Sequence, residues 1–197
     1  VAFAADALYE QTENVVYGEA HGVGLMADIF VPTGEKNGLA IIDIASGAWH
    51  SDRGKIRDHK MARMYDHFCG AGYTVFAVRP GSVTRFTSED MVDHLRTAIR
   101  WVKGQAEEYG FDPDKLGLTG ASAGGHLALM TLITGAPESD SIAAAGIFFP
   151  PTNFLDWGGN TTAMARLGDL FFLGGYTCED EEELREKAEA ASPALLI

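Results

Sequence analysis

The 197-residue sequence has few cysteines, few basic residues and no long apolar run. Its two cysteines, Cys69 and Cys178, lie far apart without the spacing of a metal site or of a C-x-x-C pair, so we expect two free thiols and no metal. Fifteen Lys and Arg stand against 28 Asp and Glu, and the formal net charge of −13 disfavours nucleic acid as a partner. No apolar run approaches the roughly 20 residues of a membrane-spanning helix, and no motif calls for a cofactor.

The chain has the size and composition of one globular domain. With 46% hydrophobic and 22% charged residues, 197 positions suffice for one core and are too few for two. Residues 1–6 (Val-Ala-Phe-Ala-Ala-Asp) are similar to the end of a signal peptide with an A-x-A cleavage site. This favours a secreted or periplasmic protein, and the alternative is a cytoplasmic protein with an alanine-rich leader.

Strand and helix patterns alternate along the chain. Apolar runs at residues 39–44, 73–78 and 143–149 are typical of buried strands in a parallel sheet. Shorter runs at 14–18 and 25–31 predict an antiparallel hairpin. Helical spacing predicts helices over 59–70, from 87 to about 110, and over 179–191. The sequence therefore predicts an α/β fold with a mostly parallel sheet, antiparallel N-terminal edge strands and helices on both faces.

Residues 152–191 carry a different pattern from the rest. Residues 152–175 are glycine-rich with scattered aromatic side chains, and the acidic helix follows them. We expect residues 1–197 to form a single domain in which 152–191 are either a lid over a site or an insertion on the surface.

Ser122 lies at the centre of a G-x-S-x-G turn, residues 120–124, between a predicted strand and a predicted helix. In that setting the turn is a nucleophile elbow, which holds the serine strained with its hydroxyl exposed. The alternative is an ordinary glycine-rich turn. Because a serine hydroxyl is a poor nucleophile, acyl transfer also needs a base and oxyanion donors.

The oxyanion donors are expected from two loops at the same edge of the sheet. One donor is the backbone N–H of Ala123, directly after the serine. The others are Gly47 and Ala48, in the loop after the strand at 39–44. Trp49 and His50 in that loop are expected to bind substrate, and His50 is a candidate to replace a missing base. His126, one helical turn beyond Ser122, is expected to pack beneath the turn.

Residues 120–128, Gly-Ala-Ser-Ala-Gly-Gly-His-Leu-Ala, resemble the elbow of the carboxylesterase and feruloyl/acetylxylan-esterase branch of the α/β-hydrolases. The resemblance extends from the N-terminal strands to Pro150. The family's oxyanion loop, His-Gly-Gly-Gly-Trp, corresponds here to Ala-Ser-Gly-Ala-Trp at residues 45–49. The resemblance implies a serine ester hydrolase that forms an acyl-enzyme on Ser122 and acts on a small or carbohydrate-linked ester.

The resemblance also implies a triad Asp and His on loops after later strands. Five of the six histidines precede Ser122, and the Asp residues after it are expected at the surface. The Ala-Ser-Pro stretch at 191–193 corresponds to the start of the family's next strand. We therefore expect a truncated hydrolase whose C-terminal strands, Asp and His follow Ile197, and a chain that is nearly inactive alone. An unpaired sheet edge at the strand ending in Phe149 predicts association.

Two other functions remain open at this point. One is a catalytically dead α/β-hydrolase-like binding protein, which the altered loop at 45–49 favours and the intact turn at Ser122 disfavours. The other is a peptidase of the prolyl-oligopeptidase type, which shares the elbow.

Overall fold

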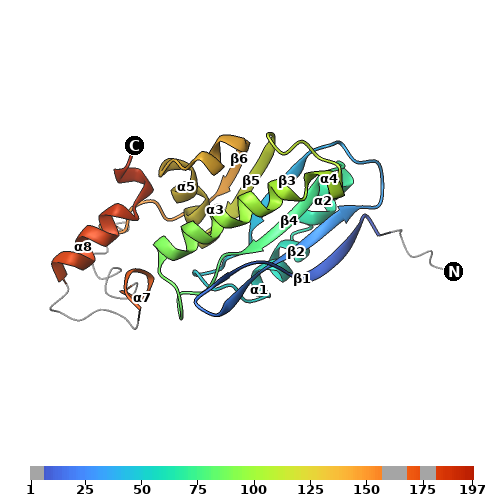
Figure 1. The fold of residues 1–197 in the computed structure, drawn as a ribbon. Coiled ribbons are helices and arrows are strands. Elements are labelled where there is room, and N and C mark those ends of the chain that lie inside the picture. The colour runs from blue at the N-terminus through green and yellow to red at the C-terminus, as the bar shows by residue number, and fades with distance from the viewer. Residues whose placement is uncertain (1–6, 157–167, 174–180) are drawn as a thin grey trace.

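The computed structural model describes residues 7–156, 168–173 and 181–197 (Figure 1). Within them a six-stranded sheet has the order β1-β2-β4-β3-β5-β6. The strands are β1 (Tyr9–Ala20), β2 (Val23–Pro32), β3 (Ala40–Ile44), β4 (Thr74–Arg79), β5 (Leu116–Ala121) and β6 (Ile142–Phe148). The pairs β1–β2 and β2–β4 are antiparallel, and β4, β3, β5 and β6 run parallel. The predicted mostly parallel sheet with an antiparallel N-terminal edge is confirmed.

Helices cover both faces of the sheet. They are α1 (Gly54–Met61), α2 (Met64–Gly70), α3 (Ser88–Gly104), α4 (Ala106–Tyr109), α5 (Ala123–Ile133), α7 (Gly168–Phe171) and α8 (Glu181–Ala190). The larger core lies between the sheet and α3 and α5, and a smaller core lies between the sheet and α1 and α2. Alternate residues of β3 serve the two cores, because Ile42 packs in the first and Ile41 in the second. At the carboxyl end of the parallel strands, α7 and α8 lie together near the start of α3 (Figure 1).

The single helix predicted over residues 59–70 is wrong. Helix α1 begins earlier, at Gly54, and a break at Arg63, whose φ of 58° is left-handed, separates it from α2. Both helices are fastened to the same buried carboxylate in β3: Asp43 Oδ2 lies 2.7 Å from His59 Nδ1 in α1 and accepts a hydrogen bond of 2.8 Å from Tyr65 Oη in α2. Asp43 lies in β3, far from both helices in the sequence, and helical spacing alone did not indicate the break at Arg63.

The prediction that residues 143–149 form a buried strand is right about the strand and wrong about its burial. Ala143 to Gly146 are exposed, and among the described residues β6 pairs with β5 alone. Phe148 and Phe149 at its end are 50% and 74% exposed. A row of small apolar residues beside unpaired backbone groups is a template for pairing with another strand.

We expect the 197-residue chain to self-associate through β6. Replacing Ala145 with lysine puts a charge on this edge and should weaken dimer formation by at least about tenfold. Sedimentation velocity over a concentration series measures the effect, and Ala62→Lys, on the exposed turn between α1 and α2, is the matched control. Equal association of both variants and the parent would contradict a role for β6.

Other expectations concern the cysteines and the chain termini. Cys69 is a free, buried thiol, and burial raises its pKa to about 12. Cys178, the signal-like residues 1–6 and much of the proposed lid lie outside the described residues. No helix in the described part of the chain is both long enough and apolar enough to cross a membrane.

Candidate active site

Ser122 lies between the end of β5 and the first residue of α5, in a strained conformation. Its φ is 55° and its ψ is −122°, values that L-residues rarely adopt and that cost about 1–3 kcal/mol. The Ser122 N–H donates to the carbonyl oxygen of Phe148 at 3.0 Å, and the Ser122 carbonyl accepts from the His126 N–H at 2.9 Å. Both backbone groups are therefore fixed, and the half-buried side chain stands at the carboxyl edge of the sheet.

The glycines around Ser122 allow the start of α5 to press against the sheet. A Cβ built on Gly124 would lie 2.3 Å from the Ile44 carbonyl oxygen, and one on Gly120 would lie 2.5 Å from the Gly124 carbonyl oxygen. The Gly124 N–H also donates to the Ser46 carbonyl at 3.1 Å. Real Cβ atoms do not approach backbone atoms this closely, so the close packing of α5 on the sheet requires glycine at both positions.

The loop after β3 forms a tight turn beside Ser122. The Gly47 N–H donates to the His50 carbonyl at 3.2 Å, and the His50 N–H donates back to the Gly47 carbonyl at 2.8 Å. Between them Ala48 and Trp49 both have positive φ, 48° and 58°, as in a type I′ turn. The Gly47 N–H is thus already engaged within the loop.

A cavity of about 480 Å³ opens onto Ser122. Two of the predicted loop residues, Ala48 and Trp49, line it with Ser122, whereas Gly47 and His50 do not. Ala123 is buried directly after Ser122, at the first position of α5. The structure thus brings Ser122, Ala48 and Trp49 to one cavity.

The far wall of this cavity contains none of the site residues expected from the sequence, although residues 152–156 begin the segment expected to be a lid or an insertion. It comes from the segment after β6: Phe149, Pro150, Pro151, Thr152, Asn153 and Asp156. Phe149 has a φ of 38°, unusual for a bulky side chain. The place of this segment after β6 could have indicated this role, because the loops that follow neighbouring parallel strands meet at one edge of the sheet.

All six histidines lie in the described part of the chain, and none lines the Ser122 cavity. His126 is fully buried, with Nδ1 3.1 Å from the Trp49 indole nitrogen Nε1 and Nε2 2.8 Å from the Ala191 carbonyl oxygen. Its position beneath the turn is the one expected from the sequence. Nor do the described residues contain a group of three His, Cys, Asp or Glu side chains able to hold a metal ion.

Acid is expected to destabilise the fold through His126. Burial lowers its pKa to about 4, and the bond to the Ala191 carbonyl offsets part of that effect. An unfolded histidine binds a proton near pH 6.5, so between about pH 6.5 and 4 the unfolded chain holds more protons and stability falls as pH falls, by up to about 3 kcal/mol. Urea unfolding at several pH values measures this loss. His126→Gln should flatten the curve in that window, and an unchanged curve would contradict the assignment.

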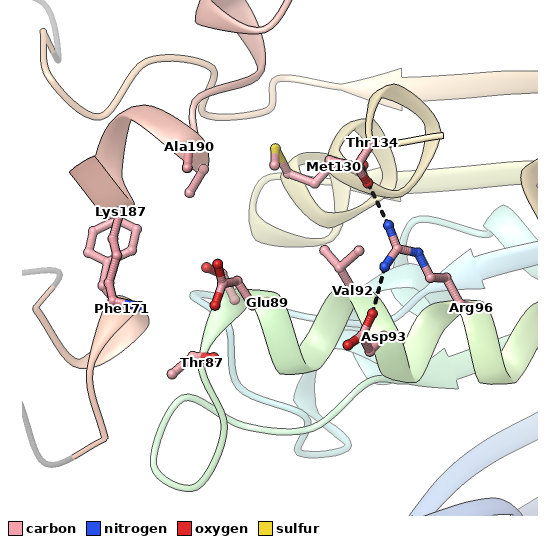
Figure 2. Close-up of a pocket in the computed structure, with 12 residues that line it drawn as sticks. Thr87, Glu89, Val92, Asp93, Arg96, Met130, Thr134, Phe171, Lys187 and Ala190 are labelled. Atoms are coloured by element: carbon pink, nitrogen blue, oxygen red, sulfur yellow. Dashed lines mark hydrogen bonds and ion pairs between the residues drawn. The ribbon is translucent and has the colours of Figure 1, made fainter. Parts of the chain in front are cut away.

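A second cavity, of about 440 Å³, lies between α3, α5, α7 and α8 and shares no lining residue with the first (Figure 2). Arg96 projects from α3 toward α5; its guanidinium bonds Asp93 Oδ1 on α3 at 2.6 Å and Thr134 Oγ1 at the end of α5 at 2.9 Å (Figure 2). This cation is already paired within the lining, which also carries the side chains of Glu89 and Lys187.

A mostly parallel sheet, with a strained serine between strand and helix and an apposed loop from the neighbouring strand, defines an α/β-hydrolase fold. More narrowly, the chain belongs to the BD-FAE family, which matches residues 27–197.

Proteins that are similar to this chain in sequence or in structure are named as esterases. The probable carboxylic ester hydrolase LipM of Mycobacterium tuberculosis is 30% identical over 152 residues, which cover 72% of this chain and 34% of LipM. The chain therefore spans about a third of that relative. Butyrate-bound Est2, a thermophilic esterase of Thermogutta terrifontis, is 30% identical with a TM-score of 0.64, covering 94% of this chain and 67% of Est2. A truncated carbohydrate esterase from gut microbiota has a TM-score of 0.75 at 20% identity, and the match covers 98% of this chain and 74% of that esterase. At this identity the likeness supports the fold alone.

Proposed function

We propose that the protein is a serine ester hydrolase in which Ser122 attacks the ester carbonyl and forms an acyl-enzyme that water then hydrolyses. The observation that carries the proposal is the strained backbone of Ser122, with a φ of 55° and a ψ of −122°, beside a cavity. Strained backbone persists where the surrounding structure over-determines it, and such positions cluster at active sites. The names of LipM and Est2 support the same reaction class.

In this proposal the oxyanion donors are the backbone N–H groups of Ala123 and Ala48. Ala123 follows the serine at the start of α5, where N–H groups have no partner within the helix. Ala48 is preferred over Gly47 because the Gly47 N–H already donates to His50, whereas Ala48 lines the cavity. Each donor would contribute about 3–4 kcal/mol to transition-state stabilisation.

The general base and its acid partner are assigned to residues outside the described part of the chain. His126 has both ring nitrogens engaged, and His50 is exposed but does not line the cavity. Without a base, the described machinery alone would retain at most about 10³–10⁴-fold acceleration over water. We therefore propose that the 197-residue chain is nearly inactive by itself.

The proposed substrate is a small or carbohydrate-linked neutral ester. Trp49, Phe149 and two prolines supply apolar walls, while Thr152, Asn153 and Asp156 supply polar rim groups. The net charge of −13 disfavours an anionic substrate. Residues 149–156 form one wall, whereas Phe171 and Lys187 line the second cavity, so we propose that the segment from 152 to 191 covers the site at its start. The N-terminal pattern is proposed to direct export.

The test compares p-nitrophenyl acetate with a matched p-nitroanilide, using the complete polypeptide that contains this chain. We expect turnover of the ester and at least about 10²-fold slower cleavage of the amide. Faster amide cleavage would instead indicate a peptidase. Binding of ester analogues without turnover would indicate a catalytically dead binding protein.

A further inference from the structure

We propose that His126 is a positioning residue that holds the Ala48 N–H toward the Ser122 cavity by binding the indole of Trp49. The proposal rests on the ester-hydrolase function for its catalytic consequence, but its structural part can be tested separately. It assigns a task to a buried histidine that is neither base nor metal ligand.

The first observation is strain in the loop. Ala48 and Trp49 are two consecutive non-glycine residues with positive φ. A turn of this kind normally uses Asn-Gly or Asp-Gly, because a Cβ disfavours the left-handed region. An Ala-Trp turn therefore needs an external anchor to keep its shape, and Ala48 takes its orientation from that anchor.

The second observation is the anchor itself. The Trp49 indole N–H donates to His126 Nδ1 at 3.1 Å, in a buried contact between residues 77 positions apart. An indole nitrogen can only donate, so Nδ1 must be the accepting nitrogen and Nε2 must carry the proton. Nε2 accordingly donates to the Ala191 carbonyl at 2.8 Å. The carbonyl after α8 thus fixes the imidazole tautomer that Trp49 requires.

The third observation is the position of His126, the residue that binds Trp49. His126 lies on α5, the helix whose first residue is Ala123 and whose preceding residue is Ser122. Tying Trp49 to this helix therefore fixes the loop donor relative to the serine and to the helix donor. Oxyanion stabilisation depends on the positions of both donors. The Gly124 N–H already ties Ser46 to the start of α5, and the Trp49–His126 bond ties the turn itself to the same helix.

Packing around the anchor leaves little freedom. Phe154 meets the ring of His126 edge-on at 5.0 Å between centroids and lies 5.8 Å from the Trp49 ring. Ser192 Oγ, fully buried, accepts from the Phe154 N–H at 2.9 Å and donates to the Ala188 carbonyl at 2.6 Å. The end of α8 therefore closes over His126 and holds it against Trp49.

The variants separate the hydrogen bond from the packing. His126→Leu removes both ring nitrogens, His126→Gln can still accept and donate, and Trp49→Phe keeps a ring but removes the N–H. His59→Gln is the matched control, because His59 is also buried and bonded but lies on α1, packed against Asp43 on the other face of the sheet. If His126→Leu fails to fold, Trp49→Phe carries the test.

The structural readout is ¹⁵N NMR of the Trp49 indole and of the Ala48 amide. Their signals should move in His126→Leu, the indole proton should exchange at least about tenfold faster, and His126→Gln should restore part of the protection. His59→Gln should leave both signals in place. Unchanged signals and exchange in His126→Leu, or in Trp49→Phe an unmoved Ala48 amide, would overturn the proposal.

The functional readout is labelling of the complete polypeptide with a fluorophosphonate. In His126→Leu and Trp49→Phe the maximal labelling rate should fall about 10- to 100-fold with little change in probe affinity, since a donor used in the transition state is displaced. An equal rate in all variants would contradict the catalytic part. If the unmodified protein is not labelled, the proposed function fails, and the NMR result still decides whether His126 positions the loop.

Discussion

Replacing Ser122 with alanine in the complete polypeptide should lower kcat toward p-nitrophenyl esters by about 10⁴- to 10⁶-fold, with a much smaller change in KM. The substitution removes the hydroxyl that would form the acyl-enzyme. It leaves the backbone donors and the cavity walls in place, so substrate binding and a small oxyanion effect remain. Steady-state kinetics with active-site concentration set by total protein measures the loss.

The matched control is Ser139→Ala, in the turn that follows the far end of α5. Ser139 Oγ donates to the Thr131 carbonyl, and the residue does not line the Ser122 cavity. Activity should stay within about twofold of the parent. Substantial turnover by Ser122→Ala, with the control unaffected, would refute Ser122 as the nucleophile.

Replacing Gly124 with alanine should destabilise the fold by about 3–5 kcal/mol or prevent folding. The added Cβ would meet the Ile44 carbonyl oxygen at 2.3 Å, a contact with strand backbone that no side-chain rotation relieves. Relief requires separating α5 from β3, which also breaks the bond from the Gly124 N–H to Ser46. Urea unfolding followed by circular dichroism measures the change.

Gly104→Ala is the comparison for this substitution. A Cβ at Gly104, the last residue of α3, would meet no atom within 4 Å, so the change should be neutral or stabilising by up to about 1 kcal/mol. Equal stability of the Gly124 and Gly104 variants would contradict the close packing of α5 on β3.

Local signals predicted the elements closest to the site. Continuous apolar runs located β3 and β4, and the glycine spacing located the junction of β5 and α5 around Ser122. These features depend on residues adjacent in the sequence: a buried strand needs an apolar run, and a tight strand-to-helix turn needs glycine.

Features that depend on distant residues were missed or predicted wrongly. Asp43 in β3 contacts His59 in α1 and Tyr65 in α2, and the burial of β6 depends on which segments pack beside it. The engagement of the Gly47 N–H was missed for a local reason, because Ala48 and Trp49 are not residues that indicate a turn with positive φ. The contact from Trp49 to His126 joins a loop to helix α5, and the two approach each other only in the folded chain. No periodicity carries such information.

The central claim is that Ser122 is the nucleophile, and peptide mapping of a fluorophosphonate adduct tests it most directly. The complete polypeptide is treated with the probe, digested and analysed by mass spectrometry. The structure predicts one adduct, on Ser122 in the peptide that joins β5 to α5. An adduct on another residue, or ester hydrolysis that continues while Ser122 stays unmodified, would contradict the claim.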